Sequence, residues 1–120
     1  MVGWFEIPVS DMSRAISFYE TVFQVEIKEV DFGGLKMGWF PDNNGAYGAT
    51  GTLIKQQTYG PSEQGTLVYF ISKDVQNELD RIESAGGKIY QAKTKISEEH
   101  GFMGVFIDSE GNRVALHSQQ

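Results

Sequence analysis

An internal repeat constrains the fold of this chain more than any other sequence feature. Residues 2–9 are rich in apolar and β-favouring side chains, and from Met12 the apolar residues recur at helical spacing, at positions 12, 15, 16, 19, 22 and 23. Asp11 stands where a helix N-cap is expected, because its carboxylate can accept from free backbone N–H groups. The same pattern returns 63 residues later, with a strand candidate over 67–71, Asp74 at the cap, and a second helical stripe at 75, 79, 82 and 85.

A second match follows the first in the same order. Residues 39–45 align with residues 105–111 at an offset of 66, and each segment reads as a strand that runs into a turn containing Asp and Gly. The two offsets differ by three residues, which a small insertion between matched elements explains. Two matches in one order indicate a duplicated structural unit.

Each half of the chain is predicted to be a β-α-β-β-β module. The first half gives a strand at 2–9, a helix at 11–23 and strands at 24–31, 34–41 and 46–54; the second gives a strand at 65–72, a helix at 74–85 and strands at 88–94, 102–107 and 112–118. Residues 55–64 are polar and read as a connector. The expected fold is α+β: one domain over 1–120 with modules at about 1–54 and 65–120, which form a curved mixed sheet around a concave cleft with the helices outside.

Composition narrows the classes of partner. The net charge of −6 argues against nucleic acid, whose phosphates require a basic surface, and favours cationic or neutral small ligands. The absence of cysteine excludes disulfides and thiolate metal sites. No apolar run approaches the ~20 residues that span a bilayer, and no basic segment followed by an apolar signal core opens the chain. We therefore expect a cytoplasmic protein with no membrane partner.

Three segments resemble a known family when they are taken in register. They are the opening IPVSDMSRAISFYETVF, the middle SKDVQNELDRIESAGGKI and the ending GFMGVFIDSEGNRVALHS. Together with the repeated module they are similar to the vicinal oxygen chelate superfamily, which includes glyoxalase I, bleomycin-resistance proteins and extradiol dioxygenases. The resemblance covers nearly the whole chain and is greatest to glyoxalase/bleomycin-resistance-like proteins.

The resemblance also implies where a metal would bind. Metal-dependent members of the family place ligands on the first and last strand of each half, usually His and Glu. The corresponding positions here are Trp4, Ala49, Leu67 and Ala115. Ala49 is placed by counting back 66 residues from Ala115, as the second repeat match requires. None of the four offers the imidazole nitrogen or carboxylate oxygen that such metals require. We therefore expect no metal and no other cofactor.

Two polar residues share the side of the strands that would face the cleft. Glu6 lies two residues beyond Trp4, and His117 lies two beyond Ala115, so alternation directs both toward the same face. One interpretation makes them ligand contacts or an acid–base pair, since a His near a carboxylate exchanges protons near neutral pH. The simpler interpretation is a solvated carboxylate and a His near the chain end.

Aromatic residues give a further indication of ligand type. Trp4 and Tyr69 share the cleft-facing parity, and flat aromatic faces with one acidic group suit planar or cationic organic ligands. The alternative is that these side chains fill space or lie at a subunit contact. Further aromatic residues fall on neighbouring strands or their ends: Trp39, Phe40, Tyr47 and Phe102.

Alternation also predicts the core between helices and sheets. If every second residue of a strand faces the cleft, the residues between them face the helix. The predicted core residues are Phe5, Ile7, Met12, Ile16, Tyr19, Val68, Phe70, Leu79, Ile82, Val114 and Leu116.

The sequence thus predicts a metal-free protein of glyoxalase/bleomycin-resistance type that binds a small organic ligand. Two alternatives stay open: a glyoxalase-like lyase or isomerase in which Glu6 and His117 are the candidate catalytic residues, and an interaction module that acts as a homodimer. The predicted ligand contacts are Trp4, Glu6, Leu67, Tyr69, Ala115 and His117.

Overall fold

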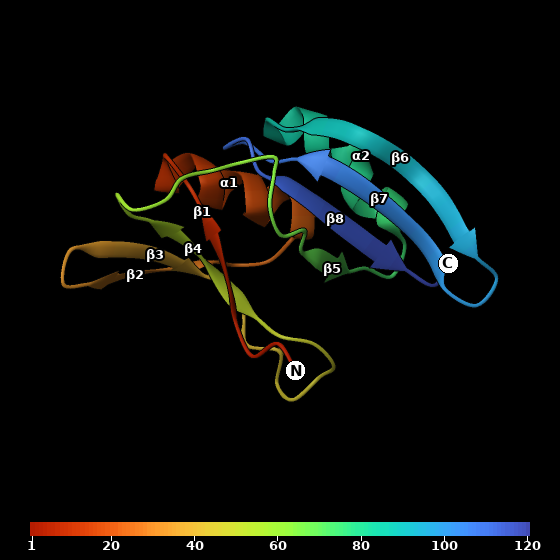
Figure 1. The fold of residues 1–120 in the computed structure, drawn as a ribbon, viewed down its shortest axis with the longest axis horizontal. Coiled ribbons are helices and arrows are strands. Elements are labelled where there is room, and N and C mark those ends of the chain that lie inside the picture. Colours follow the sequence, from red (N-terminus) through yellow and green to blue (C-terminus); the bar gives the residue numbers. More distant parts are fainter. The chain divides into compact units, whose positions relative to one another are not determined.

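The computed structural model describes residues 1–120, with the side chain of Phe32 outside the description. The chain divides into two compact units, residues 1–61 and 62–120, and each has its own four-stranded sheet and one helix (Figure 1). Unit 1 contains β1 (Phe5–Pro8), α1 (Met12–Phe23), β2 (Lys28–Phe32), β3 (Leu35–Trp39) and β4 (Gly51–Lys55). Unit 2 contains β5 (Tyr69–Ile71), α2 (Val75–Ala85), β6 (Lys88–Ser97), β7 (Gly101–Ile107) and β8 (Arg113–Ser118). The predicted α+β fold of two β-α-β-β-β modules is confirmed.

Helix α1 begins and ends where the sequence predicts. The Asp11 carboxylate accepts from the backbone N–H of Arg14 at 3.1 Å, so it supplies one of the partners that the first turn lacks. Gln24 closes the helix in the left-handed conformation, with φ of 55°, and its N–H donates to the carbonyl of Glu20. The buried side chains of the helix are Met12, Ala15, Phe18, Tyr19 and Val22.

The sheet of unit 1 has the strand order β1-β4-β3-β2, in which β1 and β4 are parallel and the other pairs antiparallel. A Cβ placed on Gly38 of β3 would meet Met12 and Ile16 of α1 at 3.2 and 3.3 Å, so this side of the sheet faces the helix. Phe5 lies on the same side, because its ring packs 5.7 Å from that of Phe40. Phe40 in turn lies 5.5 Å from the ring of Tyr19. Alternation then places Glu6 on the opposite side, which we call the helix-distal face.

Unit 2 repeats this arrangement with the strand order β5-β8-β7-β6. Asp74 caps α2 by accepting from the N–H of Gln76 at 2.9 Å, and the ammonium of Lys93 lies 2.9 Å from the same carboxylate oxygen. The hydrogen bond from Lys93, followed by the one from Gln76, stabilises the charged carboxylate. These contacts therefore lower the pKa of Asp74. Gly104 of β7 faces Leu79 of the helix, since a Cβ there would lie 2.9 Å from that side chain.

The predicted core residues lie on the helix-facing side, as expected, but not all of them are fully buried. Seven of the predicted residues are buried: Ile7, Met12, Tyr19, Leu79, Ile82, Val114 and Leu116. Phe5, Ile16, Val68 and Phe70 are half-buried. The stripe on α1 is shifted toward Phe18, which is 1% exposed and was missing from the prediction.

The largest difference from the predicted strands concerns residues 46–54, because β4 starts only at Gly51. The preceding segment forms a turn held by its own polar groups. The Asn43 amide donates to the carbonyls of Ala46 and Gly48 at 3.3 and 2.7 Å, and Asp42 accepts from the N–H of Asn44 at 3.0 Å. Such local bonds give the backbone partners outside a sheet, and therefore the strand begins later.

Within the described residues, no helix combines the length and the apolar character needed to cross a membrane.

Candidate functional site

The helix-distal face of unit 1 carries an aromatic pair beside a carboxylate. Glu6 of β1 and Trp39 of β3 both have Thr52 of β4 as their register partner, so the three residues form one row across three strands. Trp4 lies two residues before Glu6, and its ring meets that of Trp39 edge to face, with centroids 6.3 Å apart and planes at 86°. Trp4 is 44% exposed and Glu6 is exposed, so both can be reached by a ligand.

Tyr59 adds a hydroxyl to this group. Its O–H donates to Oε1 of Glu6, although the two residues lie 53 positions apart in the chain. Partial burial of the phenol, followed by the hydrogen bond to Glu6 and the charge of Glu6, raises the pKa of Tyr59 to about 12. Tyr59 therefore stays a neutral hydrogen-bond donor over the whole physiological range. The sequence prediction treated residues 55–64 as a plain connector, yet Tyr59 is the only aromatic residue in it, and that was the available signal.

We call the group of Trp4, Glu6, Trp39 and Tyr59 the Trp–Glu cluster. Tryptophan faces attract cations through the ring quadrupole, and a carboxylate adds a full negative charge. The chemistry of the cluster therefore matches an organic cation or a planar ligand with a hydrogen-bond donor.

In unit 2, three of the four predicted contacts share the helix-distal face. Tyr69 of β5 is the register partner of Ala115 of β8, and His117 is the partner of Ile71. Their parity is opposite to that of Leu116, which pairs with the helix-facing Gly104. Tyr69 is 48% exposed, whereas Ala115 is fully buried. The fourth predicted contact, Leu67, precedes β5 and is half-buried.

The same face of unit 2 also carries a charge that the sequence prediction missed. The guanidinium carbon of Arg113 lies 4.1 Å from the ring centroid of Tyr90, in cation–π geometry. Arg113 follows a turn and Tyr90 lies on β6, so only the folded sheet joins them.

Glu6 and His117 each have a partner within their own unit. The Nε2 of His117 lies 2.6 Å from the carbonyl oxygen of His100, and because a carbonyl only accepts, this nitrogen carries the proton. Glu6 accepts from Tyr59 as described. The hypothesis that the two residues form an acid–base pair stays a prediction.

The β-ladders revise one of the four positions that correspond to metal ligands in the resembling family. The pair Tyr69–Ala115 in unit 2 corresponds to Glu6–Thr52 in unit 1, so the equivalent of Ala115 is Thr52 and not Ala49. The Thr52 hydroxyl is fully buried and lies within hydrogen-bond distance of the carbonyls of Gly38 and Leu53, at 3.1 and 2.7 Å.

The revised set of Trp4, Thr52, Leu67 and Ala115 still lacks imidazole and carboxylate groups, and so does not fit a divalent metal. Among the residues that the structure describes, no three His, Cys, Asp or Glu side chains gather closely enough to hold a metal ion. The metal-free state itself remains a prediction.

Comparison with known proteins gives one family. The model of the Glyoxalase/Bleomycin resistance protein/Dioxygenase superfamily matches residues 1–116. No curated protein matches the sequence.

Solved structures give the same fold. A glyoxalase/bleomycin resistance protein from Albidiferax ferrireducens superposes with a TM-score of 0.75 at 12% identity, covering 100% of this chain and 99% of that one. TnmS3, an antibiotic binding protein from Streptomyces sp. CB03234, gives 0.69 at 19% identity, with coverage of 100% and 96%. A glyoxalase I mutant from Zea mays gives 0.74 at 17% identity, covering 98% of this chain and 46% of that one. This chain therefore spans about half the length of the maize enzyme.

Proposed function

The chain belongs to the glyoxalase/bleomycin resistance protein/dioxygenase superfamily, and from this premise we propose that it is a metal-free protein that binds a small organic ligand. The observation that carries the proposal is the Trp–Glu cluster, which presents exposed aromatic surface and a carboxylate on the helix-distal face of unit 1. The proposed ligand contacts are five of the six predicted residues: Trp4 and Glu6 in unit 1, and Leu67, Tyr69 and His117 in unit 2. Ala115, the sixth, is fully buried and is left out.

The chemistry of the cluster supports an aromatic or cationic ligand. An exposed Trp ring offers a stacking surface, and the Glu6 carboxylate favours a cation or a hydrogen-bond donor. The antibiotic-binding protein TnmS3 shares the fold. We infer by analogy that antibiotics with a planar or cationic part are the first class of compounds to screen. A cytoplasmic location and a homodimer are further proposals that follow from the sequence prediction.

The metal-free state can be tested directly. Because Trp4, Thr52, Leu67 and Ala115 offer no imidazole or carboxylate, the purified protein should retain no divalent metal after dialysis against chelator-free buffer. Elemental analysis is the measurement. Near-stoichiometric zinc, nickel, iron or manganese would contradict the proposal and would favour the lyase or isomerase alternative.

Ligand binding can be tested by thermal-shift screening against metabolites and antibiotics, since a ligand that binds only the folded state raises the apparent stability. We expect aromatic cations among the compounds that raise the melting temperature. Glu6→Gln keeps the shape of the side chain and removes its charge. It should weaken a cationic ligand by about 1.5–3 kcal/mol, the range for a hydrogen bond to a charged group. It should also lower the pKa of Tyr59 below about 12, because the charge of Glu6 is lost while the burial of the phenol, the largest cause, remains. Ultraviolet absorbance follows this titration.

Glu26→Gln is the matched control, because it removes the same charge from an exposed position of unit 1 outside the cluster. It should leave both the ligand affinity and the Tyr59 titration unchanged. Equal affinity for a cationic ligand in wild type and Glu6→Gln would show that Glu6 is only a solvated strand residue. A screen without aromatic or cationic binders would contradict the ligand class.

A further inference from the structure

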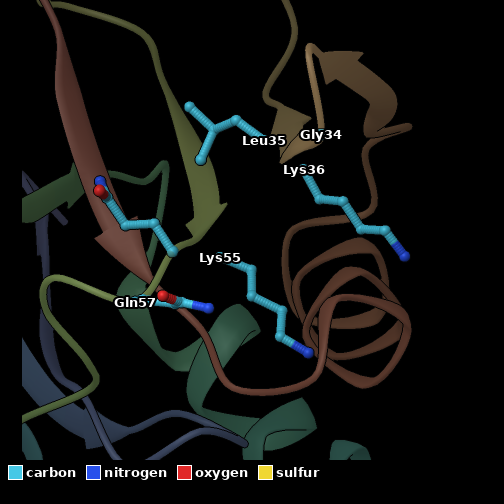
Figure 2. Close-up of a pocket in the computed structure, with 6 residues that line it drawn as sticks. Gly34, Leu35, Lys36, Lys55 and Gln57 are labelled. Carbon is cyan, nitrogen blue, oxygen red and sulfur yellow. The ribbon is translucent and has the colours of Figure 1, made fainter.

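A recess in unit 1 lies at the end of the β3–β4 ladder, next to the Trp–Glu cluster, because its lining residue Gln56 hydrogen-bonds with Tyr59. It has a volume of about 500 Å³ and is lined by Gly34, Leu35, Lys36, Lys55, Gln56 and Gln57. These residues come from the start of β3 and from the end of β4 and the segment after it. Figure 2 shows that the side chains of Lys36 and Lys55 leave their neighbouring strands toward the same side, whereas Leu35 points the other way.

The two lysines are direct register partners in the antiparallel ladder. Side chains that face each other in this way have Cβ atoms about 4.5–5.5 Å apart, and like charges at such positions destabilise a sheet. The chain carries only 10 Lys and Arg against 16 Asp and Glu, so excess positive charge does not force two lysines together. A cross-strand lysine pair is therefore a local feature that needs an explanation.

This lysine pair has no salt-bridge partner among the described residues. Neither Lys36 nor Lys55 takes part in an ion pair there, in contrast to Lys93 and Lys95, which pair with Asp74 and Glu98. The nearest acid by register is Asp31, which is opposite Lys36 on β2. Its Oδ1 already accepts from the N–H of Gly34 at 2.7 Å, where it holds the β2–β3 turn.

From this arrangement we propose that the recess is an anion site that binds a phosphate monoester through Lys36 and Lys55. Two ammonium groups on facing strands can approach one tetrahedral dianion from two sides, and lysine binds phosphate as a point charge without the planar fork of arginine. The amide of Gln57, which also lines the recess, offers a further hydrogen-bond donor. Leu35 points to the opposite side of the ladder, and the Gln56 side chain contacts Thr58 and Tyr59, so neither is assigned to the anion. Bound phosphate would also remove the repulsion between the two lysines.

The test uses the intact protein and two probes, inorganic phosphate and glycerol 2-phosphate, titrated at constant ionic strength and alkaline pH, where both are dianions. Binding is followed by thermal shift and by NMR chemical shifts. We expect saturable binding of both probes, with the ester tighter because only its hydroxyl groups can hydrogen-bond with the Gln57 amide. Inorganic phosphate binding as tightly as the ester would overturn the assignment to an ester.

Lys36→Gln and Lys55→Gln should each weaken glycerol 2-phosphate by about tenfold or more, the loss expected for one charge-assisted contact. The double variant should lose saturable binding. Lys88→Gln removes the same charge from an exposed position of β6 and should stay within about twofold of wild type. Equal losses in Lys88→Gln and Lys55→Gln would show that the effect is only net charge. The absence of saturable binding in wild type at millimolar phosphate would also overturn the proposal.

The melting temperatures of the variants show whether a loss of binding comes from misfolding. Without phosphate, Lys55→Gln should melt at the same temperature as wild type or higher, because it removes the repulsion across the ladder. Phosphate should raise the melting temperature of wild type and not that of the double variant. A lower melting temperature for Lys55→Gln would show that the pair stabilises the sheet and would contradict the proposal.

Discussion

Truncation of Phe18 to alanine should lower the free energy of unfolding by about 3–5 kcal/mol, the usual cost of removing a buried phenylalanine ring. Phe18 is 1% exposed, and its ring meets that of Tyr19 edge to face with centroids 5.0 Å apart. The variant loses both the buried apolar area and the contacts with its neighbours, because a packed interior collapses only partly around a cavity. Urea denaturation followed by circular dichroism measures the loss.

Phe23→Ala is the matched control on the same helix. The Phe23 ring stacks on Tyr19 with centroids 6.1 Å apart, but the side chain is only half-buried, so its removal should cost clearly less. If the two variants lost the same stability, the buried face of α1 would be centred where the apolar spacing put it rather than where the structure does.

This comparison shows what helical periodicity can predict. The spacing identified Ala15, Tyr19 and Val22 as one face, and the structure buries all three. It placed Phe23 in the stripe and left out Phe18, which borders these three residues on the other side, whereas the structure buries Phe18 and leaves Phe23 half-buried. Which of the two turns toward the sheet depends on the partners across the interface, such as Phe40, whose ring packs on Tyr19.

Strand parity transferred well from sequence to structure because it depends only on alternation. Phe5 faces the helix and Glu6 faces away from it, as predicted, and the same holds for Leu116 and His117 in unit 2. The predicted equivalence of Ala115 with Ala49 was wrong, because the loop before the last strand differs in length between the two units. The turn over 41–50 takes up the three extra residues before β4 starts, so the offset returns from 66 to 63 at Thr52.

The remaining features of the candidate sites depend on contacts that no local pattern encodes. Tyr59 reaches Glu6 only because the segment after β4 returns toward β1. The facing of Lys36 and Lys55 follows from the register of two strands separated by a loop, and a shift of one residue would move one lysine to the opposite face. Neither feature can therefore be predicted without the three-dimensional structure.

Gly51→Ala should destabilise the protein by about 1–3 kcal/mol, the usual cost of overpacking. A Cβ at this position would lie 2.3 Å from the carbonyl oxygen of Phe5 and 2.6 Å from Cγ of its ring, distances that no real Cβ contact reaches. Gly51 is the register partner of Phe5, and β1 is an edge strand that pairs only with β4. The added methyl group can therefore be accommodated only if β1 moves.

A movement of β1 would also disturb the Trp–Glu cluster, since β1 carries Glu6 and follows directly after Trp4. We therefore expect Gly51→Ala to weaken the Tyr59–Glu6 contact and to lower the pKa of Tyr59 below about 12. Gly60→Ala is the matched control, because a Cβ there meets nothing within 4 Å and its backbone is not left-handed. It should change stability by no more than about 0.5 kcal/mol. Urea denaturation and ultraviolet titration of both variants separate the outcomes: a stable Gly51→Ala protein with an unchanged Tyr59 titration would show that β1 does not depend on the bare backbone of Gly51.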